Sequence, residues 1–112
     1  PQDTPNHYIV DYIARYSIVE HADKWTWHFD PRRITVDPSE NVAHARDLKC
    51  PVAFIYGERS AVFPHETLKG TLDCLPPDAP VICVPDAAHH VLIDQPLALV
   101  SALRALLAGW LK

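Results

Sequence analysis

The chain has 112 residues, 48% of them hydrophobic, and a formal net charge of -4 at pH 7. A chain of this length and apolar content forms one domain or part of one, which excludes a disordered or fibrous protein. Its ten Lys and Arg residues are scattered along the sequence, which disfavours nucleic acid and anionic membranes as partners. No apolar run reaches the roughly 20 residues of a membrane span, and no signal peptide opens the chain.

Three cysteines, Cys50, Cys74 and Cys83, lie far apart in apolar segments. Their odd number and surroundings indicate reduced core thiols instead of a disulfide framework, and hence a cytoplasmic location. The chain begins at Pro1 and contains no methionine. We therefore expect it to be a piece of a longer protein.

The first predicted element is an amphipathic helix. Thr4 can cap the first free amides, and Pro5 fits the first helical position. Apolar side chains then recur three and four apart from Tyr8 to Tyr16, which predicts a helix through about Val19.

An extended segment and a short helix are predicted next. Trp25, Trp27 and Phe29 alternate with polar residues, which is typical of a short strand. Residues 32 to 38 follow as a predicted loop. Ser39 can cap a helix that runs to about Leu48.

The second half predicts two parallel strands with helices between and after them. The apolar runs 51–56 and 81–84 are typical of strands buried on both faces of a parallel sheet. Leucines at helical spacing predict a helix that ends before Pro76, and Pro96 opens a last helix that is apolar around most of its circumference and should be packed. This order indicates an α/β fold. Because two strands make an incomplete sheet, we expect the neighbouring strands in another part of the protein.

Two loops at the carboxyl ends of these strands carry the candidate chemistry, because open α/β folds place their sites there. The loop after Gly57 carries Glu58, and the loop after the second strand carries His89 and His90. This is the order of the last two members of a nucleophile, acid and base arrangement. Adjacent histidines rarely converge on one ion, so a metal site is disfavoured.

The residues 48–58 and 84–96 resemble, in this order, the penultimate strand of an α/β hydrolase and its final strand, histidine loop and last helix start. In that family a small residue usually precedes the catalytic histidine and an acid-x-proline follows it, the places of Ala88 and Asp94-Gln95-Pro96. Residues 8–31 resemble the end of the lid of epoxide-hydrolase-like and carbon-carbon-bond-hydrolase-like members. The resemblance implies the end of a helical lid and its connection over residues 1–38, and the C-terminal part of the hydrolase sheet with flanking helices over residues 39–112.

The resemblance implies that His89 is the general base, oriented by an acid. The alternative is a surface loop histidine. Ser60 holds the family's usual acid position, which makes Glu58 the candidate acid in this chain; Glu58 could equally be a solvated loop residue, and some relatives place the acid after an earlier strand. No G-x-S-x-G elbow occurs. The nucleophile is therefore expected from the N-terminal part of the same hydrolase, on the same or a separate chain, and these residues alone should be inactive.

Trp27, Phe63 and Val91 are candidate substrate-binding residues, because aromatic and aliphatic side chains suit a small, largely apolar substrate with an ester, epoxide or carbon-carbon bond. They could instead pack the lid onto the core. No cofactor is expected. The competing interpretation is a non-catalytic, hydrolase-like binding protein or a truncated product. A free-standing binding module conflicts with the open sheet edges that two strands leave.

Overall fold

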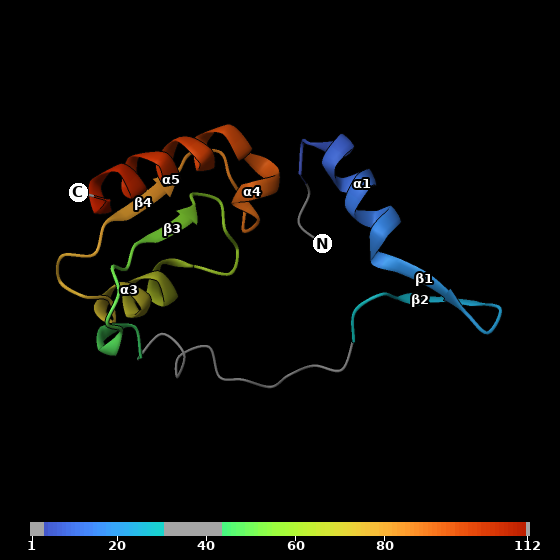
Figure 1. Ribbon diagram of the computed structural model, residues 1–112, viewed down its shortest axis with the longest axis horizontal. Helices are drawn as coiled ribbons and strands as arrows, with labels where there is room; N and C mark the ends of the chain where they lie inside the picture. Colours follow the sequence, from blue (N-terminus) through green and yellow to red (C-terminus); the bar gives the residue numbers. More distant parts are fainter. Residues whose placement is uncertain (1–3, 31–43, 112) are drawn as a thin grey trace.

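A computed structural model describes residues 4–30 and 44–111, and Figure 1 shows their arrangement. Within these residues the strands form one antiparallel pair, β1 with β2, and one parallel pair, β3 with β4. The elements in chain order are α1 (His7–Ser17), β1 (Ile18–His21), β2 (Lys24–Trp27), the 3-10 helix η1 (His44–Asp47), β3 (Phe54–Gly57), α3 (His65–Asp73), β4 (Val81–Val84), α4 (Val91–Asp94) and α5 (Pro96–Trp110).

Helix α1 begins later than the sequence predicted. Asn6 is its N-cap, and the Asn6 side-chain oxygen accepts the backbone N–H of Ile9 at 3.5 Å. Thr4, the predicted cap, instead accepts the backbone N–H of Asn6 through its hydroxyl at 3.4 Å. Both residues favour caps because a short polar side chain can reach free amides of the first turn.

The helix also ends earlier than predicted, at Ser17, because the β-branched residues Ile18 and Val19 enter strand β1. Opposite them in β2 lie Trp27 and Thr26, so the predicted extended segment pairs with what was expected to be the end of the helix. The turn of this hairpin holds two residues at positive φ, 50° and 59°, a combination typical of the two-residue turns that match strand twist.

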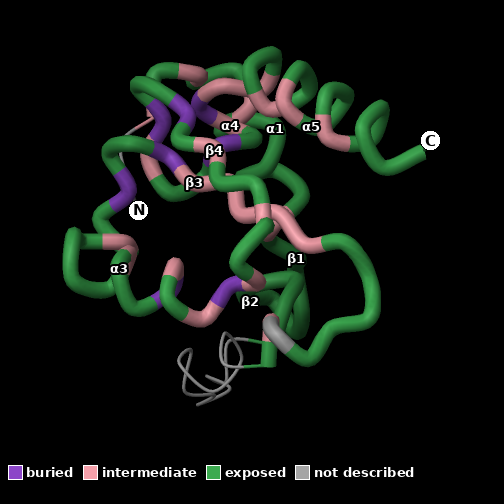
Figure 2. Tube along the Cα trace, turned by 90° about the vertical axis from the view of Figure 1, so that its left-hand side faces the viewer, coloured by how far each residue is buried: buried purple, intermediate pink, exposed green. Residues whose placement is uncertain are grey.

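The α/β part confirms the predicted order of strand, helix, strand, helix. Strands β3 and β4 are in register from Phe54 with Val81 to Gly57 with Val84. In both views they lie between α5 and α3 (Figures 1 and 2). The buried core comprises Val84, Ala87 and Val91, against which Ile55, Ile82 and Leu99 pack.

Burial of the strands and the last helix is less complete than predicted. Along β4, Val81 and Cys83 are exposed, and α5 has no buried residue, so most of its apolar surface is open, as Figure 2 shows. A strand with one neighbour and a helix with one packed side leave their other faces to solvent. These segments therefore contain more apolar side chains than the described part of the chain buries.

Two further predictions concern the cysteines and the residues before β3. Cys50, Cys74 and Cys83 are free thiols, as predicted, but Cys50 and Cys83 are exposed and do not lie in a core. The predicted loop over residues 32–38 and the first half of the predicted helix over residues 39–48 lie outside the described residues, and the described second half contains the short 3-10 helix η1. Within residues 4–30 and 44–111, every helix is too short or too polar to cross a membrane.

Candidate functional site

The two loops that follow β3 and β4 lie side by side, because the carboxyl ends of parallel strands meet at one edge of a sheet. Backbone hydrogen bonds join them: the N–H of Glu58 donates to the carbonyl of Val84 at 3.0 Å, and the N–H of Arg59 donates to the carbonyl of Ala87 at 2.8 Å. The ladder of the sheet thus continues past the strands. These hydrogen bonds fix the position of one loop relative to the other.

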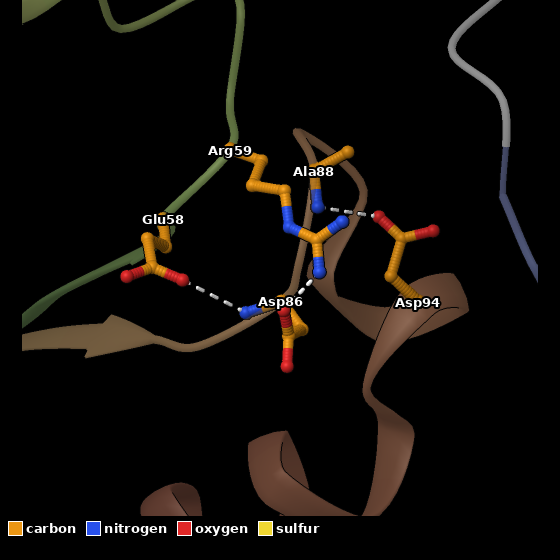
Figure 3. Close-up of polar contacts among 5 residues, drawn as sticks. All are labelled: Glu58, Arg59, Asp86, Ala88 and Asp94. Atoms are coloured by element: carbon orange, nitrogen blue, oxygen red, sulfur yellow. Dashed lines mark hydrogen bonds and ion pairs between the residues drawn. The ribbon is translucent and has the colours of Figure 1, made fainter.

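Side chains tie the same loops together at the surface (Figure 3). The Glu58 carboxylate accepts the backbone N–H of Asp86 at 3.1 Å, and the Arg59 guanidinium forms an ion pair with the Asp86 carboxylate. Asp86 itself has a positive φ of 58°, which aspartate tolerates better than most residues. Sequence reasoning missed the pairing of Arg59 with Asp86, for which the opposite charges of the two loops were the available signal.

Asp94 anchors the histidine loop through a hydrogen bond. One of its carboxylate oxygens, Oδ2, accepts the backbone N–H of Ala88 at 2.8 Å (Figure 3), and the residue is buried. The other oxygen, Oδ1, is buried without a hydrogen-bond partner among the described residues. The acid of the acid-x-proline motif therefore fixes the residue immediately before His89.

Replacing Asp94 by alanine is expected to lower the free energy of unfolding by roughly 1–3 kcal/mol, because the amide of Ala88 loses its acceptor. Asp94→Asn keeps an oxygen acceptor and should cost less. Urea unfolding followed by circular dichroism measures both. Unchanged or higher stability of the alanine variant would mean that the unpartnered Oδ1 costs as much as the bond at Oδ2 contributes.

The imidazole of His89 lies beside the first loop. Its Nδ1 is 3.3 Å from the hydroxyl oxygen of Ser60, and its ring centroid lies 6.0 Å from that of Phe63 and 5.1 Å from that of His90. Glu58, the predicted acid, has its carboxylate at the backbone of Asp86. The structure therefore places Ser60, at the family's acid position, against the candidate base. The catalytic role of Glu58 stays a prediction.

A cavity of about 270 Å³ lies between α1, β2 and the start of α4. Its lining is mostly apolar, with Trp27 contributed by β2 and His90 by the loop before α4. The remaining lining residues are Thr4, Val10, Ile13, Ala14, Ser17, Ile93 and Asp94. Such a space suits a small apolar molecule, since ligand pockets are concave and mainly apolar with a few polar groups.

The three predicted substrate-binding residues lie in different surroundings. Trp27 lines the cavity and stacks on Phe29 at 5.4 Å between ring centroids. Phe63 makes an edge contact with Phe54 and lies near His89. Val91 belongs to the buried core. The structure thus brings one of the three to the cavity and a second to the candidate base.

Tyr56 and Cys83 face each other across β3 and β4. A side-chain hydrogen bond with Cys83 raises the pKa of the Tyr56 phenol above its ordinary value of 10.0, and burial and the negative charges of the Cys83 thiolate and Glu58 add to this. The folded protein therefore keeps this proton to a higher pH than the unfolded chain. The stabilisation is present below about pH 10 and is lost as the pH rises through the folded pKa.

Cys83→Ala is accordingly expected to lower the pKa of Tyr56 toward its ordinary value, because the largest cause of the shift is removed. Phenolate absorbance during an alkaline titration measures this, with Tyr56→Phe as the control that assigns the transition. An unchanged titration in Cys83→Ala would contradict the hydrogen bond as the cause.

No cluster of three or more His, Cys, Asp or Glu side chains within the described ranges is arranged to hold a metal ion. His89 and His90 lie with their rings tilted by 59° to each other. The chemistry that these loops offer is that of an imidazole beside a hydroxyl.

Comparison with known proteins shows a similarity to a solved structure. No family model and no curated protein matches the sequence. The chain is similar to the crystal structure of an E-2-(acetamidomethylene)succinate hydrolase, an α/β hydrolase, with 34% sequence identity and a TM-score of 0.50. The match covers 55% of this chain and 23% of the length of that hydrolase. This likeness supports a hydrolase-like α/β fold for the part of the chain that it covers.

Proposed function

We propose that this chain supplies the general-base histidine, His89, to the active site of an α/β hydrolase that acts on a small, largely apolar substrate. The observation that carries the proposal is the place of His89. Its loop follows β4 at the carboxyl edge of a parallel sheet, and its Nδ1 lies 3.3 Å from Ser60 in the loop after β3. The likeness to a hydrolase of known structure supports the hydrolase-like fold that the proposal requires.

In this function the imidazole takes a proton from the attacking group and returns it to the leaving group. The attacking group is either a serine hydroxyl or a water that opens an ester of an aspartate nucleophile. No G-x-S-x-G elbow occurs in the 112 residues. The nucleophile therefore comes from the N-terminal part of the same hydrolase, on the same chain or a separate one, and residues 1–112 alone are inactive.

The cavity beside the histidine loop is the proposed substrate space. Its volume of about 270 Å³ lies near the lower end of ligand pockets, so the substrate is small. Trp27 and the apolar side chains of α1 provide contact area for an acyl or aromatic group. The scissile bond is an ester, an epoxide or a carbon-carbon bond.

A substrate panel tests the proposal on the complete protein. The panel contains p-nitrophenyl acetate, styrene oxide, a β-diketone and E-2-(acetamidomethylene)succinate, and turnover is followed by absorbance or chromatography. Turnover of at least one compound is expected. The alternative, a non-catalytic binding protein, predicts a rise in melting temperature with these compounds and no product. That combination would overturn the proposed activity.

A further inference from the structure

We infer that Ser60 is a positioning residue for His89: its hydroxyl accepts a hydrogen bond from Nδ1–H and so leaves the lone pair on Nε2. Because Nε2 is then the atom through which the proposed base reacts, this inference rests in that respect on the proposed function. The contact itself is a property of the folded loops. A neutral hydroxyl then stands where the resemblance leads one to expect a carboxylate.

The position of Ser60 is set by its backbone. Its N–H donates to the carbonyl of Gly57 at 3.0 Å, and its carbonyl accepts the N–H of Phe63 at 3.3 Å. Only 8% of the residue is exposed. The hydroxyl is therefore held at 3.3 Å from Nδ1 by a short turn and has little freedom to move away.

The carboxylates of the two loops and of α4 each make a contact of their own through one oxygen. Glu58 accepts the backbone N–H of Asp86, Asp86 pairs with Arg59, and Asp94 accepts the backbone N–H of Ala88. These contacts hold the loops together. They leave the hydroxyl of Ser60 as the group that the turn after β3 presents to the imidazole.

The chemical consequence concerns the tautomer. In neutral histidine one ring nitrogen carries the proton, and the hydrogen bond at one nitrogen decides which form prevails. A hydroxyl that accepts from Nδ1 selects the form in which Nε2 can take a proton. Unlike a carboxylate, this hydroxyl carries no charge to stabilise the imidazolium that forms when the base has acted.

Side-chain nitrogen NMR of histidine-labelled protein tests the tautomer, with His89→Gln to assign the signals. Wild type and Ser60→Thr, which keeps the hydroxyl, should show His89 with the proton on Nδ1. Ser60→Ala should shift the population toward the Nε2–H form. Ser101→Ala is the matched control, because the Ser101 hydroxyl donates to the Leu97 carbonyl on α5, and it should leave the His89 signals unchanged. A wild-type imidazole protonated at Nε2, or a Ser60→Ala spectrum equal to wild type, would overturn the inference.

A second variant tests the position of residue 60 against Nδ1. In Ser60→Asp the new carboxylate stabilises the imidazolium, so the midpoint of the His89 titration should move to higher pH. Ala61→Asp adds the same charge at the neighbouring exposed position and should move the midpoint less, because the side chain that lies at 3.3 Å from Nδ1 is that of residue 60. The charged and titratable residues of the two loops and of α4, namely Glu58, Arg59, Asp86, His90 and Asp94, are the same in both variants. Equal midpoints in the two variants would place residue 60 away from Nδ1 and overturn the inference. Because these readouts need no turnover, the proposed hydrolase activity can fail while the positioning role holds, or the reverse.

Discussion

His89→Gln should lower kcat/KM of the complete hydrolase by about 10²- to 10⁴-fold, the usual contribution of a positioned general base. Glutamine has a similar length and can still form a hydrogen bond with Ser60, but it cannot take up and release a proton near neutral pH. The loop should keep its structure, since its fixed points are backbone contacts of Arg59 and the carboxylate of Asp94. Steady-state kinetics on whichever panel compound is turned over, with circular dichroism as the check on folding, measures the effect.

Two other histidines show whether the loss is specific. His65 is the exposed first residue of α3, so His65→Gln should leave kinetics unchanged. His90 lines the cavity, and its backbone carbonyl, not its side chain, accepts the N–H groups of Ile93 and Asp94 in α4, so His90→Gln should affect KM more than kcat. If His90→Gln lost all turnover while His89→Gln stayed active, His90 and not His89 would be the base.

Gly57→Ala should destabilise the protein severely, by about 3 kcal/mol or more, at the upper end of what overpacking costs. A Cβ at this position would lie 2.8 Å from the carbonyl carbon of Ala87 and closer still to the carbonyl oxygens of Ala87 and Ala88. These are backbone atoms, so no side-chain rotation relieves the overlap. The two loops would have to separate, which breaks the hydrogen bonds that join them. Urea unfolding measures the stability, and the NMR signals of His89 report the loop.

Gly70→Ala is the matched control with the opposite sign. Gly70 lies inside α3, and a Cβ there meets no atom within 4 Å. Alanine should therefore stabilise the helix by about 0.5–1 kcal/mol, because glycine loses more conformational freedom on folding. If Gly57→Ala were as stable as Gly70→Ala, the close approach of the two loops at Gly57 would be refuted.

The elements that the sequence predicted correctly are those with an unambiguous local signal. The apolar run before Gly57 predicts β3, although the strand covers only the last three residues of that run and Gly57 itself. Pro96 marks the start of α5 because its fixed φ suits the first helical position. Ile18 and Val19 continue the helical spacing of the segment before them and are equally good strand residues. Their pairing with β2 depends on a turn whose residues, Ala22 and Asp23, are not the usual ones for that geometry.

For the candidate site, chain order predicted the two loops but not the contact between them. Parallel strands bring their carboxyl ends together, which is why Glu58 and His89 could be placed at one edge. Which side chain of the first loop meets the imidazole depends on the turn after Gly57, and that turn buries Ser60 and exposes Glu58. Residue type alone favoured the carboxylate, because the direction of a loop side chain has no periodic signal in the sequence.

The register of β3 and β4 also decides how this site can change in length. Gly57 is opposite Val84, and Ser60 and His89 follow these two residues by three and five positions. An insertion in residues 61–80 lengthens only the crossover and leaves both side chains where they are. An insertion in residues 58–59 or 85–88 changes the number of residues between the paired strand ends and Ser60 or His89, and so separates the hydroxyl from the imidazole. Natural relatives that keep both the serine and the histidine should therefore vary in the length of the crossover and hardly at all in the lengths of these two short segments.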